Sequence, residues 1–397
     1  MFKHERRIRI NELIQNSGKV SVFELSVFFN VSHETIRSDL RWLTKNSNII
    51  RYHGGACSCR QLQCNINNID VSQNEICGSS RTLHPYIGRV FVLGAFNIDI
   101  ISVSNTLPKP GESLIAKYSS IKVGGKGANQ ATAANAICNC VFFACKIGKD
   151  HLAQYAKQYF NTCGVNFVYF ESDFEKTGYA LVLVSDDDGE NMVVISRGAN
   201  CDFSKDNVNS LKKIIFESDV VLLQLEINIS AVKTVIDIAK SRGCKIILNA
   251  APYTSELVNF VSNVNILTAN KIDAFKLTGI EIKSISDACN ALRILKLMGV
   301  DIPIITMGSD GVVYLENDVA FHLPCYPAVA IDTTGAGDAF NGALAAATSA
   351  GVELQKSIKL ASSYASLSVE RLGASNMPSL HQATLRMENN NIQPTKI

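Results

Sequence analysis

The stretch Asp332-Thr333-Thr334-Gly335-Ala336-Gly337-Asp338-Ala339-Phe340 decides how the larger part of this chain is organised. It leads into a helix of small residues expected at 339–349. A glycine turn before a helix brings several free backbone N–H groups together, and the helix dipole adds positive potential there. Such a turn can hold a phosphoryl group, and Asp338 can accept a proton from an attacking hydroxyl. An aspartate at this point is also an ordinary N-cap.

A second glycine-rich segment is Gly124-Gly125-Lys126-Gly127-Ala128-Asn129-Gln130-Ala131. It is not a Walker A loop, because glycine rather than serine or threonine follows Lys126. Glycines allow a backbone to approach a ligand closely, and Lys126 and Asn129 can then hydrogen-bond several hydroxyls. A helix start that needs only glycine flexibility would look the same, so both interpretations stay open for this segment.

Short apolar runs alternate with amphipathic stretches from residue 89 onward. The runs are residues 90–93, 141–145, 220–225, 245–248 and 302–306, and the stretches are 152–160, 231–240 and 286–298. This alternation predicts an α/β fold with a central, mainly parallel sheet. Residues 179–184 and 192–196 flank an Asp-Gly turn and predict a β-hairpin.

The N-terminal part of the chain is basic. Residues 1–60 hold ten Lys/Arg and five Asp/Glu, a net charge of +5, whereas the other 337 residues carry 28 Lys/Arg and 31 Asp/Glu, a net −3. A basic head suggests a polyanionic partner or a solvated basic surface. The chain has no run of 18 uncharged apolar residues and no apolar signal region at residues 1–10, so we expect a cytoplasmic protein without a membrane span.

Residues 22–29 and 33–44 predict two helices joined by a tight turn, with Ser32 as the N-cap of the second. Ile36, Leu40 and Leu43 form its apolar face, and a plausible wing hairpin follows at residues 48–55. The pattern resembles the DNA-binding domain of DeoR-type bacterial repressors, which implies binding to double-stranded DNA. The expected DNA contacts are His33, Thr35, Arg37, Ser38, Arg41 and Arg51. That family has a second arginine where this chain has Ser38, and a helical packing module is the alternative.

Together, the two glycine-rich segments closely resemble the ribokinase-type (PfkB-type) carbohydrate kinases. The resemblance runs from about Arg89 to Pro378 and includes residues 94–99, 108–112, 224–226, 249–252 and 306–311. It implies a ribokinase-like α/β sandwich with a small β-lid, to which the hairpin would belong and through which a homodimer would form. It also implies ATP-dependent phosphorylation of the primary hydroxyl of a pentose, D-ribose to D-ribose 5-phosphate.

The resemblance implies a role for each matching residue. Asp338 would be the catalytic base, and Gly335, Ala336 and Gly337 the anion hole. The sugar would contact Asn97, Asp99, Gly125, Lys126, Asn129, Glu226 and Asp338. ATP would contact Asn270, Thr306, Gly308, Gly311 and Gly337. A monovalent cation such as potassium would lie at Asp332, Thr334, Ser368, Arg371 and Gly373, largely on backbone carbonyl oxygens.

One position departs from the kinase pattern. The family's Asn-x-x-Glu segment, which orders magnesium-bound water, is Asn270-Lys271-Ile272-Asp273 here. Aspartate is one methylene shorter, so we expect an active enzyme with a raised requirement for Mg²⁺. The magnesium ion would bridge ATP phosphate oxygens and be held mainly through water, with Asp273 acting through that water.

These features predict a DNA-binding domain at residues 1–56, a polar linker at 57–88, a kinase domain at 89–386 and a tail at 387–397. The first functional hypothesis is an active pentose kinase joined to a DNA-binding domain. The alternatives are a sugar-sensing transcriptional regulator with a weak or inactive kinase-like body, and a kinase for deoxyribose or another furanose.

Overall fold

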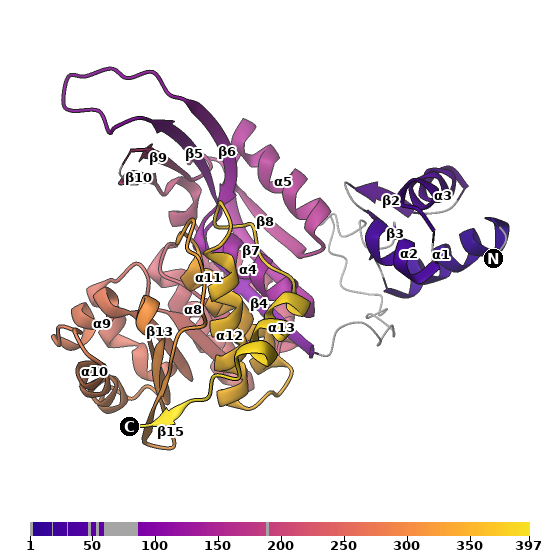
Figure 1. Cartoon of the computed structure of the whole chain (residues 1–397). Coiled ribbons are helices and arrows are strands. Elements are labelled where there is room, and N and C mark those ends of the chain that lie inside the picture. The colour runs from indigo at the N-terminus through magenta and orange to yellow at the C-terminus, as the bar shows by residue number, and fades with distance from the viewer. Residues whose placement is uncertain are drawn as a thin grey trace. The chain divides into compact units, whose positions relative to one another are not determined.

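The computed structural model describes residues 3–17, 19–29, 31–46, 49–52, 55–58, 86–187 and 190–397. The chain forms two compact units, Met1–Pro85 and Tyr86–Ile397, whose elements are labelled in Figure 1. Most of the expected linker, residues 59–85, lies outside the described residues, and so does the Asp188-Gly189 turn of the expected hairpin.

The smaller unit is a helix-turn-helix followed by a wing. Its elements are α1 (Lys3–Ser17), β1 (Lys19–Ser21), α2 (Val22–Phe29), α3 (His33–Asn46), β2 (Ile49–Tyr52) and β3 (Gly55–Ser58), with strand order β1-β3-β2. The predicted apolar face of α3 is confirmed, because Ile36, Leu40 and Leu43 are at most 2% exposed. The Ser32 hydroxyl accepts a hydrogen bond from the Thr35 backbone N–H at 3.2 Å and caps the helix as expected.

A buried carboxylate joins the first helix of this unit to the third. Asp39 on α3 is fully buried and accepts hydrogen bonds from Nε of Arg6 (2.7 Å) and of Arg7 (2.8 Å) on α1. The Arg7 guanidinium also lies 4.6 Å from the centre of the Trp42 ring. Two arginines of the basic N-terminal segment therefore stabilise the fold of this unit.

Among the described residues, the larger unit contains a ten-stranded sheet of order β17-β16-β15-β14-β13-β12-β11-β4-β7-β8. The strands from β8 to β14 are parallel, and the strands beyond β14 are antiparallel, which confirms the mainly parallel sheet. Their bounds are β4 (Tyr86–Leu93), β7 (Cys138–Gly148), β8 (Asn166–Ser172), β11 (Val220–Leu223), β12 (Lys245–Asn249), β13 (Ile266–Asn270), β14 (Ile302–Thr306), β15 (Val312–Glu316), β16 (Val319–Leu323) and β17 (Thr395–Lys396).

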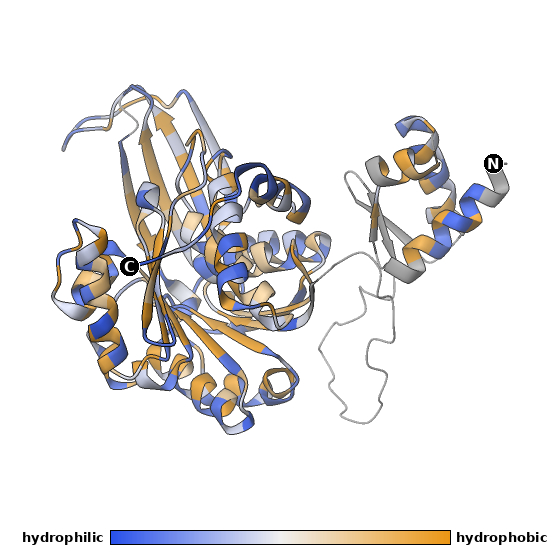
Figure 2. Cartoon of the chain, turned by 60° about the horizontal axis from the view of Figure 1, so that its bottom comes forward, coloured by the Kyte–Doolittle hydropathy of each residue, from blue (hydrophilic) through white to orange (hydrophobic). Residues whose placement is uncertain are grey.

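Helices cover both faces of this sheet (Figure 1). They are α4 (Lys126–Asn135), α5 (His151–Cys163), α6 (Lys205–Ser210), α7 (Lys212–Phe216), α8 (Ile229–Arg242), α9 (Lys271–Thr278), α10 (Ile285–Leu297), α11 (Ala336–Ser349), α12 (Leu354–Ser368) and α13 (Leu380–Asn390). Val221 and Leu223 of β11 pack in the core with α8 and α10, whereas Val220 and Leu222 pack with α4 and α11. Burial on both faces explains the continuous apolar strands, which are orange in Figure 2.

A separate four-stranded sheet projects from the larger unit, with the order β10-β9-β5-β6 (Figure 1). Its strands are β5 (Asn97–Ser104), β6 (Tyr118–Gly124), β9 (Tyr179–Ser185) and β10 (Asn191–Ser196). The predicted hairpin corresponds to β9 and β10, which pair antiparallel. Several apolar side chains of this small sheet are 43–67% exposed, namely Leu181, Met192, Val193, Val194 and Ile195.

Four boundaries differ from those expected. Both ends of the expected linker at 57–88 belong to strands, since β3 runs to Ser58 and β4 begins at Tyr86. Helix α11 begins at Ala336, three residues before the expected start, because Gly335 adopts a left-handed conformation and serves as N-cap. Residues 387–397, expected to be a tail, belong to the fold, since α13 extends into them and β17 pairs with β16 at the sheet edge.

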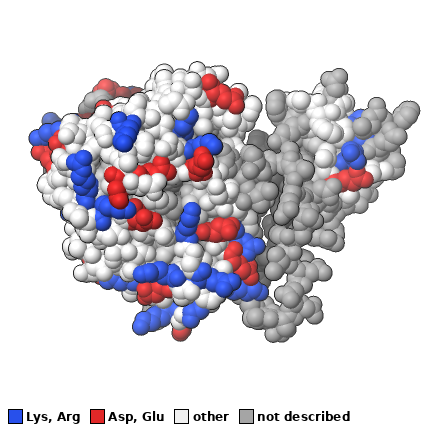
Figure 3. Space-filling view, turned by 90° about the horizontal axis from the view of Figure 1, so that it is seen from below, with Lys and Arg blue, Asp and Glu red and all other residues white. Residues whose placement is uncertain are grey.

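The surface of the larger unit carries mixed charge on the face seen in Figure 3, where basic and acidic side chains lie next to one another. Within the described part of the chain, no helix has the length and apolar character needed to cross a membrane.

Candidate active site

The turn at residues 335–338 presents the first backbone N–H groups of α11. Gly335 has a φ of 80°, and a Cβ there would lie 2.7 Å from the Ala374 Cβ, so the turn requires glycine. A Cβ on Gly337 would meet no atom within 4 Å, so the space beside the turn is open. The N–H groups of a first helical turn have no partner within the helix, which makes this turn suited to an anion.

Asp338 lies in this turn and is 5% exposed. Asn129 Nδ2 donates to its Oδ2 at 2.9 Å, and Gln130 Nε2 donates to its Oδ1 at 3.0 Å. Both amides belong to α4, which packs tightly on α11: a Cβ on Gly342 would lie 2.5 Å from the Ala133 Cβ. The buried Oδ1 of Asn129 has no hydrogen-bond partner among the described residues, so it can accept a ligand hydroxyl.

The glycines of the second motif let the start of α4 approach the backbone that follows β4. Gly125 has a φ of 90°, and a Cβ there would lie 2.7 Å from the Ala95 carbonyl oxygen. A Cβ on Gly127 would lie 2.6 Å from the carbonyl carbon of Gly94. These glycines therefore have a packing role, and the same packing brings the residues between and after them into the site.

Asn97 at the start of β5 is held by the segment that follows the small sheet. Asn200, in the short 3-10 helix η2 (Gly198–Cys201), donates from Nδ2 to the Asn97 Oδ1 at 2.9 Å. Asn200 also bonds the backbone N–H and the carbonyl oxygen of Phe96, both at 3.0 Å. A Cβ on Gly178 would lie 2.3 Å from the Asn97 Oδ1, so glycine leaves room for this side chain.

Five charged side chains, which we call the charged cluster, lie close enough to interact electrostatically: Asp99, Lys126, Glu226, Asp273 and Asp338. The Asp338 carboxylate raises the pKa of Lys126 against the effect of burial, and Glu226 adds to the rise. Burial raises the pKa of Glu226 and of Asp273, and Lys126 opposes both shifts. The Lys126 backbone N–H also donates to Glu226 Oε2 at 2.8 Å. The structure thus brings the predicted base, the lysine and the predicted magnesium-water ligand together.

Asp99 is a further carboxylate of this cluster whose pKa is raised. Burial, reinforced by Glu226 and Asp338, raises the pKa of Asp99 to about 6, and Lys122 opposes the rise. Lys122 stands directly across from Asp99 in the antiparallel pairing of β5 and β6. A Cβ on Gly124 would lie 2.2 Å from the Asp99 Oδ2, so this glycine gives the carboxylate its space.

The residues predicted for ATP gather at the carboxyl ends of neighbouring parallel strands, where ligands of α/β proteins usually bind. Asn270 ends β13 and pairs with Thr306, which ends β14. The Asn270 side chain accepts a hydrogen bond from the Asp273 backbone N–H at 2.8 Å and so caps α9. Gly308 and Gly311 form the next turn with φ of 65° and 88°.

One carboxylate joins the two loops predicted to surround a monovalent cation. Asp332 Oδ1 accepts a hydrogen bond from the Thr334 N–H at 2.9 Å, and its Oδ2 accepts one from the Gly373 N–H at 2.8 Å. The Arg371 N–H donates to the Ser368 carbonyl at 3.1 Å in the second loop. Each oxygen of the Asp332 carboxylate thus accepts one backbone N–H and keeps a second lone pair. No group of three or more His, Cys, Asp or Glu side chains in the described ranges could hold a metal ion.

The predicted DNA-contacting side chains of α3 are accessible. His33, Arg37 and Arg41 are exposed, and Thr35 and Ser38 are half-buried. Arg37 and Arg41 both pair with Glu34 of the same helix, at 3.6 and 2.5 Å. Exposed pairs of this kind contribute at most about 1 kcal/mol, so phosphates can replace the carboxylate. Arg51 belongs to β2, and its side chain lies outside the described part of the chain.

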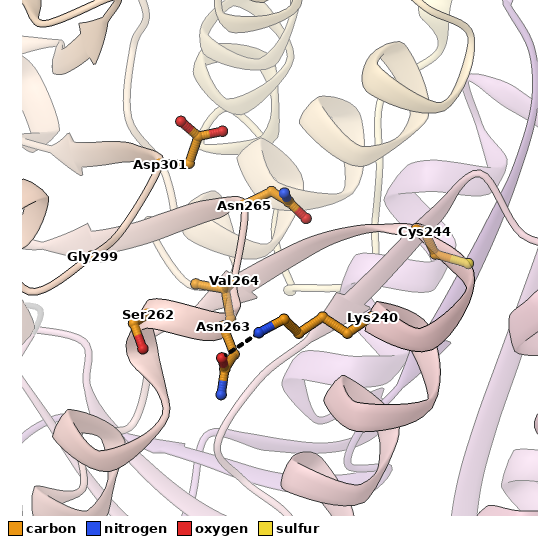
Figure 4. Close-up of a pocket in the computed structure, with 9 residues that line it drawn as sticks. Lys240, Cys244, Ser262, Asn263, Val264, Asn265, Gly299 and Asp301 are labelled. Atoms are coloured by element: carbon orange, nitrogen blue, oxygen red, sulfur yellow. Dashed lines mark hydrogen bonds between the residues drawn. The ribbon is translucent and has the colours of Figure 1, made fainter.

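A cavity of about 220 Å³ lies away from these residues, at the amino ends of β12, β13 and β14 (Figure 4). Its lining includes Cys244, Asn265 and Asp301, each of which directly precedes one of those strands. Lys240 reaches across it and donates to the Asn263 Oδ1 at 2.7 Å. None of the predicted site residues lines this cavity, which lies at the opposite edge of the sheet from them.

Several polar side chains near the site had no role assigned from the sequence. Gln130, Gln224 and Asn249 lie within segments that carried the kinase resemblance, and amides among buried apolar residues were the available signal. Arg197 gave no such signal. It donates to the Glu226 carbonyl oxygen at 3.1 Å and to the Ile227 carbonyl oxygen at 3.0 Å, which fixes the backbone that carries Glu226.

Known proteins share both parts of this organisation. Residues 88–381 match the pfkB family of carbohydrate kinases, and residues 6–62 match the DeoR-like helix-turn-helix domain. Ribokinase of Haemophilus influenzae is 33% identical over 295 residues, which are 74% of this chain and 96% of that protein. Deoxyribokinase of Salmonella typhi is 31% identical over 296 residues, with the same shares of 74% and 96%.

The fold is also found in solved structures. The structure of Arabidopsis thaliana ribokinase complexed with ribose and ATP superposes with a TM-score of 0.69 at 28% identity, covering 76% of this chain and 99% of that one. This chain therefore belongs to the pfkB family of carbohydrate kinases, as an ATP-dependent sugar kinase that carries a DeoR-like helix-turn-helix domain ahead of its kinase domain.

Proposed function

We propose that this chain phosphorylates the primary hydroxyl of a pentose and converts D-ribose to D-ribose 5-phosphate. The observation that carries the proposal is a buried Asp338 carboxylate, held by two amides at the start of α11 and electrostatically coupled to Lys126. Similarity to ribokinase supports ribose as the substrate. Similarity to deoxyribokinase makes deoxyribose the competing substrate.

In the proposed reaction, Asp338 takes the proton of the sugar hydroxyl. The hydroxyl oxygen forms a bond to the γ-phosphorus of ATP while the bond from that phosphorus to the departing ADP oxygen breaks. The N–H groups of residues 335–337 stabilise the charge on the phosphoryl group, because they lie at the N-terminus of α11 beside the open space at Gly337. The Ala336 N–H, which donates to the Thr333 carbonyl oxygen at 3.3 Å, must exchange that partner for the phosphoryl oxygen. Alignment and charge neutralisation dominate such transfers.

The other groups of the site bind and orient the reactants in this proposal. Asn97, Asp99, Gly125, Asn129 and Glu226 hold the sugar, with the unpaired Asn129 Oδ1 accepting a sugar hydroxyl. Asn270, Thr306, Gly308 and Gly311 contact ATP. Asp273 would order water on a magnesium ion, and that ion would neutralise phosphate charge. Carbonyl oxygens of the two loops would hold a potassium ion, and Asp332 joins these loops through its bonds from Thr334 and Gly373.

The test is ADP formation by the full chain with D-ribose, 2-deoxy-D-ribose and other furanoses in the presence of magnesium and potassium. We expect the highest kcat/KM for D-ribose, and loss of a general base in Asp338→Asn should lower kcat by about 10²–10⁴. A higher kcat/KM for deoxyribose would refute D-ribose as the preferred substrate and assign deoxyribose instead. No ADP from any pentose would refute the kinase proposal and favour the sugar-sensing regulator.

We also propose that α3 enters the major groove of double-stranded DNA, with Arg37 and Arg41 released from Glu34 to contact the DNA. In gel shifts with DNA from neighbouring sugar genes, log affinity should fall by about 0.9 per phosphate contact for each decade of salt. An absent or salt-insensitive shift would contradict this.

We further propose that the small sheet forms a homodimer contact. Its strand β10 leaves Met192, Val193, Val194 and Ile195 at least half exposed, which is costly for apolar side chains in a monomer. Sedimentation should therefore show a dimer, and Val194→Lys should shift it to monomer. A monomeric wild-type chain would refute the contact.

A further inference from the structure

The catalytic carboxylate is oriented by side chains that the proposed chemistry does not use. We infer that Gln130 is a positioning residue for phosphoryl transfer: its amide sets the orientation of the Asp338 carboxylate, and Gln224 and Asn249 set the orientation of that amide. The inference rests on the proposed role of Asp338 as the base.

Every hydrogen-bonding atom of the Gln130 side chain is engaged. Its Nε2 donates to the Asp338 Oδ1 at 3.0 Å and to the Asn249 Oδ1 at 3.3 Å. Its Oε1 accepts from the Gln224 Nε2 at 2.6 Å. An amide nitrogen has two N–H donors, and here each has its own acceptor. Because donors and acceptors alternate around Gln130, the amide is satisfied in one orientation, with its N–H groups toward Asp338.

The chain of hydrogen bonds returns to the turn that carries the base. Asn249 Nδ2 donates to the Thr268 Oγ1 at 3.3 Å, and the Thr268 Oγ1 donates to the Asn341 Oδ1 at 2.6 Å. The Asn341 Nδ2 then donates to the Gly337 carbonyl oxygen at 2.7 Å. Side chains from two strands thus connect α4 to α11 on both sides of Asp338.

The burial of Gln130 indicates that its amide has a role beyond packing. Gln130 is 0% exposed, between the buried Asn129 and Ala131 of α4. A buried amide costs about 1–3 kcal/mol wherever its partners are missing. If position 130 served only to pack α4 on α11, an apolar side chain would do so without this cost. Asn129 differs, because its buried Oδ1 has no hydrogen-bond partner among the described residues. Gln130 has no polar atom left for the sugar, so it acts on the reaction only through Asp338.

The decisive variant is Gln130→Met in the full chain. It keeps the side-chain length and removes the donor, so the carboxylate is no longer held on Oδ1. Misplacement of a catalytic group by about 1 Å can cost about 10²-fold, and we expect a fall of that order in kcat. The sugar KM should change much less than kcat, since the sugar-binding side chains other than Asp338 are untouched. A KM that rises while kcat is kept, or an unchanged kcat, would overturn the inference.

A matched control separates positioning from general loss of a buried amide. Asn135 lies on the same helix, is 9% exposed and donates to the Cys163 carbonyl oxygen at 2.8 Å. Asn135→Leu should lower thermal stability and leave kcat unchanged. If Gln130→Met does not fold, Gln130→Glu keeps the bond from Gln224 and places a second carboxyl beside Asp338. The two carboxyls then share a proton, so kcat at neutral pH should fall; a wild-type kcat would refute the inference.

A double variant distinguishes failure of this inference from failure of the proposed base. If Gln130 acts only through Asp338, then Gln130→Met combined with Asp338→Asn should have the kcat of Asp338→Asn alone. If the double variant instead falls below Asp338→Asn by the same factor in kcat that Gln130→Met causes alone, Gln130 has an independent role and the inference is overturned. A wild-type kcat in Asp338→Asn itself would refute the base assignment instead.

Discussion

Replacing Asp99 by asparagine should stabilise the kinase domain while weakening sugar binding. Burial, reinforced by Glu226 and Asp338, raises the pKa of Asp99 from 3.8 to about 6. One unit of pKa corresponds to about 1.4 kcal/mol, so the ionised carboxylate costs the folded state about 3 kcal/mol at neutral pH. Asparagine has nearly the same shape and carries no charge, so most of this cost should disappear.

The pH dependence of this gain follows from the raised pKa. Above about pH 6, the folded protein holds Asp99 ionised and the full cost applies. As the pH falls from about 6 toward 3.8, Asp99 binds its proton in the folded state before the unfolded one, and the cost shrinks. Below pH 3.8 the group is protonated in both states, and asparagine should give no advantage.

The assay is urea unfolding of the full chain, wild type against Asp99→Asn, at neutral pH and at successively lower pH. Asp150→Asn is the matched control: burial would raise the pKa of Asp150, but hydrogen bonds from Thr177 and Ala153 outweigh it and lower the pKa. That variant should therefore lose stability at neutral pH. The sugar KM of Asp99→Asn should rise by about tenfold or more, because a charged acceptor is worth about 1.5–3 kcal/mol. A destabilised Asp99→Asn at neutral pH, or a gain that persists in acid, would refute the reasoning.

Two further predictions concern other carboxylates. Asp273→Glu should lower the magnesium concentration needed for half-maximal activity, because the longer side chain restores the reach to metal-bound water; equal magnesium dependence in both proteins would contradict this. Asp39→Ala leaves Arg6 and Arg7 without their buried partner, a change that costs about 3–5 kcal/mol. It should abolish DNA gel shifts and leave sugar kinase activity intact, and retained DNA binding would show that the pairs do not hold the helix-turn-helix.

Local sequence patterns were sufficient to predict a helix or strand where the apolar residues of that one segment determine its structure. The apolar runs at residues 220–225 and 302–306 predicted strands that the structure contains, because strands buried on both faces need continuous apolar residues. The apolar spacing of Ile36, Leu40 and Leu43 predicted the buried face of α3. Residues 387–397 were missed as part of the fold, because the two residues of β17 are strand only through pairing with β16.

Sequence motifs alone identified the kinase fold, the helix-turn-helix and the residue types of the site, since glycines, an aspartate and a lysine at short spacing mark places where backbone approaches a ligand. The tertiary structure decided which groups act on one another. Gln130 lies 208 positions from Asp338 and Asn200 lies 103 from Asn97, so no local pattern relates them. Their roles arise because α4 packs on α11, and η2 against β5, closely enough for hydrogen bonds. Such contacts depend on distances in the folded protein, and positions along the chain do not give these distances.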